Sequence, residues 1–503
     1  MKKTATTLAV LGMGKTGKAT QAFLEKLGFE TLPLDDKQEG FVGGATESID
    51  GASLAGVVVS PGIPFDHPWV RHAQKAGIAI LSDMDLFRCV LPEVVVVGVT
   101  GTNGKSTTTA LVHHILSLAY PNVVLGGNIG VPVLEAVCGV SSEDNIPLFR
   151  RRLENGLQGG VFYREKRERV RLVPGDATPI YVLELSSYQL AWSRELGVDI
   201  AVWTNLTPDH LDRHGTIEAY RQAKQKIFEG ASYAVMGVDD VPSRKVYRSL
   251  QKSSLPVVGA HVQRPNELKS GDCEVVVDSL GCLRAEKQSE SFGISDGDFP
   301  VYSLAEISSL KGRHNWQNMA LAVAAARVLG VPEEMVRQGL QTFKGLPHRL
   351  EDVGSTQVQT RRGPSEIRFL NDSKATNAES LIKALESFPN IPIYLLAGGR
   401  AKSDGIAPAV PYMTSVRKVF LFGEATDRFE GELNGHVPYV RCGDLKNALD
   451  KAWTAACRET ENNEKGGLIL LSPACASFDQ FSSYEARGEA FRVAVRRLLQ
   501  ESL

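Results

Sequence analysis

The sequence predicts an α/β protein that is built from several domains. Short apolar segments alternate with helical patterns along the chain, which is typical of parallel sheets covered by helices. Glycine-rich turns follow two of the early predicted strands, as they do where a strand runs into a helix. The chain has 503 residues, and because domains usually hold about 100–200 residues, we expect three of them. We place them at 1–92, 93–346 and 347–503.

Composition excludes several classes of protein. With 43% hydrophobic and 23% charged residues, the chain is too apolar to be disordered. Its 56 basic and 58 acidic residues give a net charge of −2, so no global basic field exists to bind nucleic acid or an anionic membrane surface. Seven scattered cysteines without a C-x-x-C pair favour a reducing cytosol over a disulfide framework or a zinc ribbon. No apolar run is long enough to span a bilayer.

The first predicted domain begins with a strand at Thr7–Leu11. A signal peptide is a poor alternative, because Lys15 and Lys18 interrupt the apolar stretch and no small-residue cleavage site follows. The strand leads into Gly12-Met-Gly14-Lys-Thr-Gly17 and a helix that extends to Lys26. We therefore expect a Rossmann-like domain.

The glycine motif of this domain admits three interpretations. A second strand ends at Asp35-Asp36, about 20 residues after the glycines, as in a dinucleotide fingerprint. A third strand, Val57–Val59, runs into Ser60-Pro61-Gly62. The motif could bind NAD, bind another diphosphate such as that of a UDP-sugar, or form a simple tight turn between strand and helix.

The strongest local signal follows the predicted strand Val94–Val97. The segment Gly98-Val-Thr-Gly101-Thr-Asn-Gly104-Lys105-Ser106-Thr107 joins a glycine-rich loop to a helix start. Backbone N–H groups would face an anion, Lys105 would reach the terminal phosphates, and a hydroxyl of Ser106 or Thr107 would bind Mg²⁺. The match to a P-loop is imperfect, since Val99 occupies the first glycine position. We favour nucleotide binding over a bare glycine-rich helix start.

Polar residues follow the next two predicted strands of this domain. Glu184 ends the apolar strand Tyr181–Leu183, where a carboxylate is costly unless it is paired or bound to a metal such as Mg²⁺. Asp209 and His210 come shortly after the strand Ile200–Trp203. Zinc is a less attractive partner for them than a hard metal beside a phosphate site. We expect the neighbouring Asp212 and His214 to start or cap the next helix.

Lys224 lies within a predicted apolar helix face. The helical period in 217–228 places Lys224 with apolar residues, whereas Lys226 points away. A buried amine tends to lose its proton, and a neutral lysine can react with CO₂ to give a carbamate, which is an anionic ligand for Mg²⁺. Periodicity alone nevertheless favours a lysine that extends to solvent.

Two features complete the pattern. Residues 139–178 look like an insertion with Arg150-Arg151-Arg152 and an Arg164–Arg171 cluster. Because Glu165 and Glu168 partly neutralise this charge, a solvated, partly mobile loop is favoured over a basic docking patch.

The helices that end the middle domain are predicted at Asn318–Leu329 and Glu333–Phe343.

The last domain carries four predicted strands, each followed by polar or glycine-rich sequence. They are Ile367–Leu370, Ile393–Leu396, Val419–Phe422 and Leu468–Leu471. Ligands of open α/β sheets bind beyond the carboxyl ends of the strands, so we expect a site in these loops.

In combination, these motifs resemble the Mur ligases of bacterial cell-wall synthesis. The resemblance runs from Gly12 to Gly488 and fails mainly in 139–178 and in parts of 240–300. The segments that carry it are Gly101–Thr107, Gly127-Asn128-Ile-Gly130, Leu183–Gln189, Asp209–Asp212, His314–Asn318, Gly345–Arg349, Asn371–Asn377 and Ser472–Phe481. The last two are similar to the branch of the family that adds D-glutamate, and the Asp-Asn-Pro-Arg motif of the branch that adds diamino acids is absent.

The resemblance implies both a fold and a reaction. The fold would have a Rossmann-like N-terminal domain that binds UDP, a central ATPase domain of the P-loop type, and a Rossmann-like C-terminal domain that binds the amino acid. The reaction would be ATP-dependent ligation of D-glutamate to UDP-N-acetylmuramoyl-L-alanine through an acyl phosphate, in the cytoplasmic stage of peptidoglycan synthesis and thus in cell shape and cell division. It also implies a pair of Mg²⁺ ions, a CO₂-derived carbamate on Lys224, and a monomer.

The resemblance further implies roles for particular residues. The UDP substrate would be bound by Gly14, Lys15, Thr16, Asp35, Ser60, Pro61, Gly62, Asn128, Ser186 and His210. ATP would be bound by Gly101, Thr102, Asn103, Gly104, Lys105, Ser106, Thr107, Asn315, Asn318, Arg349 and Asp372. D-Glutamate would be bound by Lys374, Thr376, Lys402, Ser477 and Tyr484, the last of which is often Phe in the family. The metal ligands would be Ser106, Thr107, Glu184, His210 and carbamylated Lys224, and the catalytic groups Lys105, Glu184, His210, Lys224 and Lys374.

Other functions remain as alternatives. Within enzymes these are a sibling muramyl-peptide ligase, folylpolyglutamate synthetase, or an NAD-dependent oxidoreductase that rests only on Gly12–Gly17. Outside enzymes the alternative is an ATP-gated interaction module that uses the basic insertion.

Overall fold

The computed structural model describes residues 7–36, 54–140, 143–159, 178–194, 196–262, 275–285, 302–304, 307, 310, 313–402, 405–463 and 466–501. The chain forms two compact units, the first made of 1–307 with 313–343 and the second of 308–312 with 344–503. Among the described residues, no helix is both long enough and apolar enough to cross a membrane.

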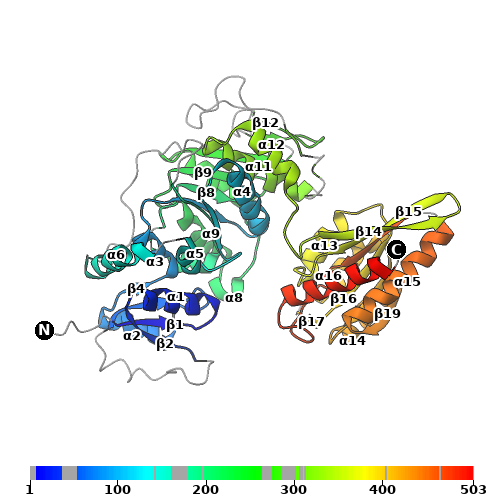
Figure 1. The fold of residues 1–503 in the computed structure, drawn as a ribbon, viewed down its shortest axis with the longest axis horizontal. Helices are drawn as coiled ribbons and strands as arrows, with labels where there is room; N and C mark the ends of the chain where they lie inside the picture. Colours follow the sequence, from blue (N-terminus) through cyan, green and yellow to red (C-terminus); the bar gives the residue numbers. More distant parts are fainter. Residues whose placement is uncertain are drawn as a thin grey trace. The chain divides into compact units, whose positions relative to one another are not determined.

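The first unit begins with a small parallel sheet (Figure 1). Its strand order is β2 (Glu30–Leu34), β1 (Thr7–Leu11), β3 (Leu54–Val59) and β4 (Ile80–Leu81). The helices of this part are α1 (Lys15–Lys26), α2 (Pro68–Ala76) and α3 (Asp83–Val90). The predicted strand Thr7–Leu11 and the helix ending at Lys26 are confirmed.

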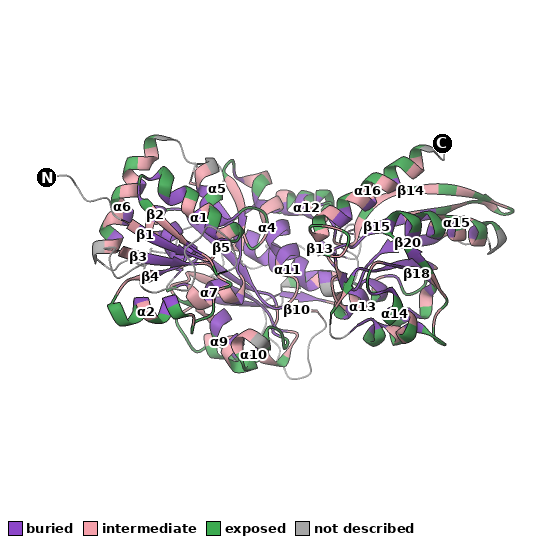
Figure 2. Ribbon diagram, turned by 90° about the horizontal axis from the view of Figure 1, so that it is seen from below, coloured by how far each residue is buried: buried purple, intermediate pink, exposed green. Residues whose placement is uncertain are grey.

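The same unit contains a larger sheet of nine strands. Its order is β13 (Tyr302–Ser303), β12 (Cys282–Ala285), β11 (Val275–Val277), β10 (Val257–Val262), β9 (Tyr233–Gly237), β8 (Ile200–Trp203), β5 (Val95–Thr100), β7 (Ile180–Glu184) and β6 (Val123–Gly127). The strands from β11 to β6 pair in parallel, and only β12 and β13 run antiparallel to their neighbours. Apart from the half-buried β6, the parallel strands are largely buried, because helices cover the sheet on either side (Figure 2).

Most helices of the larger sheet lie in the connections between its parallel strands, and α11 and α12 follow β13. They are α4 (Lys105–Ala119), α5 (Val133–Val140), α6 (Ile146–Gly159), α7 (Ser187–Trp192), α8 (Leu211–His214), α9 (Ile217–Gln225), α10 (Val241–Leu250), α11 (Arg313–Val328) and α12 (Glu333–Thr342). Helices α11 and α12 confirm the two helical segments that were predicted before the last domain.

One hydrophobic core joins the two sheets of the first unit. It contains Phe23 of α1, Phe87 of α3, Leu153 of α6 and Tyr181 of β7. The 92/93 boundary that we predicted therefore falls between two sheets that share buried side chains. This shared core explains why the two sheets form a single compact unit.

Helix α6 corrects the prediction for the insertion. Leu153 is fully buried, and the side chain of Arg150 lies over the Phe29 ring and donates a hydrogen bond of 3.1 Å to the Gly28 carbonyl. Arg152 donates 2.6 Å to the Val90 carbonyl at the end of α3. Residues 146–159 thus form a packed helix, because the apolar face of α6 completes the core that the two sheets share. The predicted Arg164–Arg171 cluster lies outside the described residues.

The second unit is another α/β layer. Its sheet order is β14 (Glu351–Thr360), β15 (Gly363–Asn371), β20 (Gly467–Leu471), β16 (Ile393–Gly398), β18 (Val416–Phe422) and β19 (Tyr439–Gly443). Only the β14–β15 pair is antiparallel. A two-stranded ribbon of β17 (Arg400–Ala401) and β21 (Cys475–Ala476) lies at the carboxyl ends. The helices are α13 (Ala378–Glu386), α14 (Thr426–Leu433), α15 (Leu445–Asn463) and α16 (Tyr484–Glu501). All four predicted strands are present.

Candidate active site

A glycine-rich cradle joins β5 to α4 at the carboxyl edge of the large sheet. Gly101 and Gly104 have φ values of +146° and +81°, which side chains rarely adopt. A Cβ at Gly104 would lie 2.2 Å from Oδ1 of Asn318, and one at Gly101 would lie 1.9 Å from Oγ1 of Thr204. The cradle is therefore bounded by α11 on one side and by the end of β8 on the other.

The residues after β8 hold the cradle in place. Asn205 accepts from the Asn103 backbone N–H at 2.9 Å and donates to the Asn103 carbonyl at 3.0 Å. Thr204 donates to the same carbonyl at 2.6 Å. Sequence reasoning missed both residues, although their position directly after a predicted parallel strand was a usable signal.

The structure brings the two predicted asparagines of α11 to the cradle. Asn318 donates to Asn315 at 3.1 Å and accepts from the Thr108 hydroxyl of α4 at 3.3 Å. Both asparagines are buried beside the helix start that carries Ser106 and Thr107. Backbone N–H groups and hydroxyls at a helix start are groups that can bind a polyphosphate and a hard cation.

Two lysines lie on the inner side of the cradle. Lys105 donates to the carbonyls of Gly101 and Thr102 at 3.0 and 2.8 Å. Lys224 of α9 donates to the Gly101 carbonyl at 2.6 Å, and its ammonium lies 4.7 Å from the centre of the Tyr220 ring. The expectation that Lys224 extends to solvent is wrong, since the residue is only 1% exposed. The physical reason is that its helix face packs against the cradle, where the Gly101 carbonyl accepts a hydrogen bond from it.

Burial changes the chemistry of Lys224. Desolvation, followed by the positive charge of Lys105, lowers the pKa of Lys224 well below its ordinary value, while Asp209 and Glu184 oppose the shift. A lysine in this state can be a neutral nucleophile. The predicted carbamate is chemically feasible here.

Glu184 has one carboxylate oxygen without a protein partner. Its Oε1 accepts from the Asn128 amide at 2.8 Å, whereas its Oε2 is buried and finds no hydrogen bond among the described residues. No ion pair to Glu184 is formed within the same set, so the alternative of a salt-bridged strand end has no support there. An orphaned carboxylate oxygen at the carboxyl end of β7, beside β5, fits a hard cation such as Mg²⁺.

His210 lies at the rim of the cradle region. It begins α8 in a left-handed conformation (φ +52°), and its Nδ1 is 3.3 Å from the Tyr188 hydroxyl. His214 ends α8 and its Nε2 is 3.0 Å from the Ser187 hydroxyl. The Asp212 side chain lies outside the described set. Among the residues that the structure describes, no three His, Cys, Asp or Glu side chains gather into a preformed metal site.

The first glycine loop is held by residues that follow β2 and β3. Asp35 accepts from the Met13 backbone N–H at 2.7 Å, and Ser60 donates to the Gly12 carbonyl at 2.6 Å. Gly17 is required because a Cβ there would lie 1.9 Å from the Gly12 oxygen. Residues Gly14, Lys15, Thr16, Pro61 and Gly62 remain accessible around the loop.

The first loop is also connected to the large sheet. Lys15 donates to the Gly130 carbonyl at 2.9 Å, directly beyond the Asn128 turn. Ser186 begins α7 through a reciprocal capping arrangement with Gln189. Among the residues predicted to bind the UDP substrate, Lys15 thus connects the first loop to the turn that carries Asn128.

The second unit gathers its predicted residues at the carboxyl ends of β15, β16 and β20. Asp372 is buried and accepts from the Ser472 hydroxyl at 2.8 Å; burial raises its pKa to about 7, and Arg349 opposes the shift. The Lys374 ammonium lies 5.7 Å from the Tyr484 ring centre. Ser477 is buried, Lys402 is exposed, and Thr376 is half-buried.

The sequence did not identify Arg487 as a site residue, although it lies one turn after Tyr484 on α16. Its guanidinium is fully buried and donates to the Ser373 hydroxyl at 2.9 Å and to the carbonyls of Ser373 and Cys475 at 2.8 and 3.0 Å. One buried cation thus connects the loops that carry Lys374 and Ser477.

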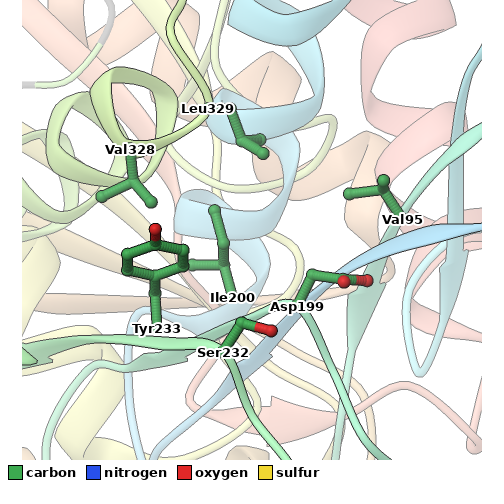
Figure 3. A pocket seen from close by; sticks show the side chains of 7 residues that line it. All are labelled: Val95, Asp199, Ile200, Ser232, Tyr233, Val328 and Leu329. Atoms are coloured by element: carbon green, nitrogen blue, oxygen red, sulfur yellow. The ribbon is translucent and has the colours of Figure 1, made fainter. Parts of the chain in front are cut away.

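A small cavity lies at the opposite edge of the large sheet (Figure 3). It is lined by Val95, Asp199, Ile200, Ser232, Tyr233, Val328 and Leu329 and has a volume of about 10 Å³. That volume holds one water molecule. A nucleotide would not fit in this cavity. The cradle at the carboxyl edge therefore stays the candidate for nucleotide binding.

A strand, glycine loop and helix at the carboxyl edge of a parallel sheet, with lysine and hydroxyl groups behind it, define a nucleotide-binding α/β protein. Residues 99–326 match the family model described as the Mur ligase middle domain. Two relatives are called UDP-N-acetylmuramoylalanine--D-glutamate ligase. That of Nitrobacter hamburgensis is 36% identical, with 98% of this chain and 96% of the relative covered. That of Sphingopyxis alaskensis is 37% identical, with 97% of each covered.

A solved structure shares the fold. The UDP-N-acetylmuramate-alanine ligase of Thermotoga maritima matches with a TM-score of 0.54 at 16% identity, covering 98% of this chain and 99% of that one. The chain belongs to the Mur ligase family.

Proposed function

We propose that this chain joins D-glutamate to the alanyl carboxylate of UDP-N-acetylmuramoyl-L-alanine at the expense of ATP, in the cytoplasmic stage of peptidoglycan synthesis. The observation that carries this proposal is the full-length similarity to relatives that are named for this ligation. The cradle, the buried Lys224 and the orphaned Glu184 oxygen support it, since a ligase of this kind must handle a triphosphate and its metal.

The proposal divides the chain into three functional domains. Residues 1–92 would bind UDP, 93–346 would bind ATP, and 347–503 would bind D-glutamate. The two separate sheets of the first unit and the six-stranded sheet of the second support this division. We propose that the protein acts as a monomer.

Activation of the substrate would occur at the cradle. The alanyl carboxylate oxygen attacks the γ-phosphorus of ATP, the bond to the bridging oxygen breaks, and ADP leaves with an acyl phosphate formed. Lys105 would hold the β- and γ-phosphates and offset the charge that develops on them. Asn315 and Asn318 would orient the nucleotide from α11.

Glu184, Ser106 and Thr107 would hold one Mg²⁺, and His210 and carbamylated Lys224 would complete a second site. Magnesium supplies charge neutralisation of the transferring phosphoryl group. Lys224 would contribute through its low pKa, which leaves an amine able to take up CO₂.

The amine of D-glutamate would then attack the acyl carbon, and collapse of the tetrahedral intermediate would release inorganic phosphate. Lys374 and Lys402 would bind the glutamate carboxylates, and Thr376, Ser477 and Tyr484 would complete the pocket. The amine must lose a proton to attack, and His210 is our candidate for the base. Arg349 and Asp372 would contact ATP.

The test is mass analysis of the product formed from ATP, D-glutamate and UDP-N-acetylmuramoyl-L-alanine. We expect one D-glutamyl residue added per phosphate released, and Lys105→Met should lower the rate at least 100-fold by removing the cradle charge. A panel of other amino acids, including diamino acids and L-glutamate, serves as the control. Phosphate release that needs no amino acid, or equal use of a diamino acid, would contradict the proposal.

A further inference from the structure

The carbonyl oxygen of Ile63 accepts two hydrogen bonds from side chains of the helices α7 and α8. Ile63 directly follows Ser60-Pro61-Gly62 at the end of β3. The Trp192 indole of α7 donates to it at 3.1 Å, and the Arg213 guanidinium of α8 donates to it as well. Both lone pairs of one loop carbonyl are therefore used by residues that lie 129 and 150 positions further along the chain.

Arg213 is held between two aromatic rings. Its Cζ lies 5.2 Å from the ring centre of Phe65, which belongs to the same loop as Ile63, and 5.4 Å from that of Tyr188 on α7. Phe65 also packs on Trp192, with ring centres 4.4 Å apart. A guanidinium between two rings is attracted by both, so Arg213 connects the loop to α7.

The contacts continue from Tyr188 to the cradle. The Tyr188 hydroxyl is 3.3 Å from Nδ1 of His210, and the Tyr220 hydroxyl is 3.2 Å from the Thr102 hydroxyl of the cradle. The Tyr220 ring packs against His210 at 6.2 Å between ring centres and also lies beneath Lys224.

At its other end, the same series of contacts reaches the first glycine loop. Ser60 donates to the Gly12 carbonyl, three residues before Ile63. Arg213 is thus the charged member of an unbroken set of contacts between the two glycine-rich loops.

We propose that Arg213 is a positioning residue that couples occupancy of the first glycine loop to the arrangement of His210 and Lys224 at the cradle. This inference rests on the proposed function, because it takes the first loop to hold the uridine diphosphate. A ligand that orders the loop after β3 fixes Ile63 and Phe65, and through them the start of α8. Coupling of this kind is reciprocal, so the UDP substrate and the adenine nucleotide strengthen one another's binding.

The experiment measures binding of UDP-N-acetylmuramoyl-L-alanine by calorimetry, with and without a nonhydrolysable ATP analogue, together with steady-state kinetics. We expect Arg213→Met to raise KM for the UDP substrate about tenfold, which corresponds to about 1.4 kcal/mol. It should also abolish the gain in affinity that the analogue gives. Its affinity for the analogue alone should stay within about twofold of the parent, because no phosphate contact is removed. Arg213→Lys keeps a cation between the rings and should recover most of the effect.

The matched control is Arg221→Met, which removes a guanidinium of the neighbouring helix that pairs with Glu218. It should change neither KM nor the coupling. Phe65→Leu removes one of the two rings at a half-exposed site where folding is not at risk. The double variant Arg213→Met/Phe65→Leu should be no worse than Arg213→Met alone, since both act through one contact.

The inference is overturned if Arg213→Met and Phe65→Leu leave KM and the coupling unchanged, or if their effects multiply independently. Should Arg213→Met fail to fold, Phe65→Leu gives the decision, because it removes one of the two rings that hold Arg213 and should by itself raise KM for the UDP substrate and weaken the coupling. A parent protein that binds no UDP substrate and forms no product would instead refute the proposed function, so the two failures are distinguishable.

Discussion

Lys105 and Lys224 donate to the same carbonyl oxygen, that of Gly101, at distances of 3.0 and 2.6 Å. Two ammonium groups on one acceptor repel each other, and Lys224 is the buried one. Desolvation, together with the positive charge of Lys105, therefore lowers the pKa of Lys224 well below its ordinary value. The two lysines of the cradle thus differ in environment, since Lys105 is half-buried and Lys224 is buried.

Removal of the Lys224 amine should abolish turnover. Lys224→Ala is expected to lower kcat at least 100-fold, because no anionic oxygen can then be formed at this position. Added formate or acetate should restore part of the rate by occupying the space left by the side chain. The measurement is steady phosphate release as a function of carboxylate concentration.

The matched control is Lys226→Ala, because Lys226 donates to the Ala191 carbonyl, away from the cradle. We expect its turnover to stay within about threefold of the parent. Near-normal activity of Lys224→Ala would remove the basis for a role of this lysine in the reaction.

Gly104→Ala should selectively weaken ATP binding. The added Cβ would meet the Asn318 side chain at 2.2 Å, and a positive φ is costly for alanine. We expect KM for ATP to rise at least tenfold with little change in KM for D-glutamate. Gly14→Ala is the control, since nothing lies within 4 Å of its Cβ and its φ is negative. Equal KM values for ATP in both variants would show that the cradle tolerates the side chain.

Truncation of α6 side chains should destabilise the first unit. Leu153 is fully buried in the core shared by the two sheets, so Leu153→Ala should cost about 2–5 kcal/mol of unfolding free energy. Thermal or urea unfolding measures the change. Leu280→Ala at a position that is 75% exposed should change stability by less than about 0.5 kcal/mol. A loss at Leu153 no larger than that at Leu280 would mean that the insertion does not support the core.

Asp83 should make stability depend on pH. Its carboxyl is buried at the start of α3, and burial raises its pKa from 3.8 to about 7. The folded state therefore binds more protons than the unfolded state between these values. This stabilising contribution is complete below pH 3.8 and is lost as the pH rises through 7.

Asp83→Asn should flatten the pH profile of the unfolding free energy. Relative to the parent, the variant should gain on the order of 2 kcal/mol between about pH 5 and about pH 8. Asp66→Asn, at a side chain that is 74% exposed, should follow the parent profile. Parallel profiles for the parent and Asp83→Asn would refute the assignment.

Arg487→Lys should weaken amino-acid binding. A lysine cannot reach the Ser373 and Cys475 loops together, since only the planar guanidinium presents donors in several directions. We expect KM for D-glutamate to rise at least fivefold while KM for the UDP substrate stays constant. Arg496→Lys, on the exposed side of the same helix, is the control. An unchanged KM for D-glutamate would show that these loops hold their shape without the guanidinium.

The sequence alone determined the local structural motifs of this protein. The strand–loop–helix signal of Gly101–Thr107, the strands at Thr7–Leu11 and Ile200–Trp203, and the apolar face around Lys224 follow from periods and turn residues that lie within about 15 positions of one another. Such patterns depend on backbone conformation and on which face is apolar, and both are local properties.

Only the tertiary structure decided which distant residues those motifs contact. Lys224 can be buried because the Gly101 carbonyl, 123 residues away, accepts a hydrogen bond from it, whereas periodicity alone favoured solvent. Residues 146–159 pack as a helix because Phe87 and Tyr181 leave an apolar surface that Leu153 fills, although their arginine-rich sequence suggested a solvated excursion. Arg213 reaches Ile63 across 150 residues. Side-chain burial and pairing depend on neighbours that distant segments supply, and no local pattern encodes which segments come together.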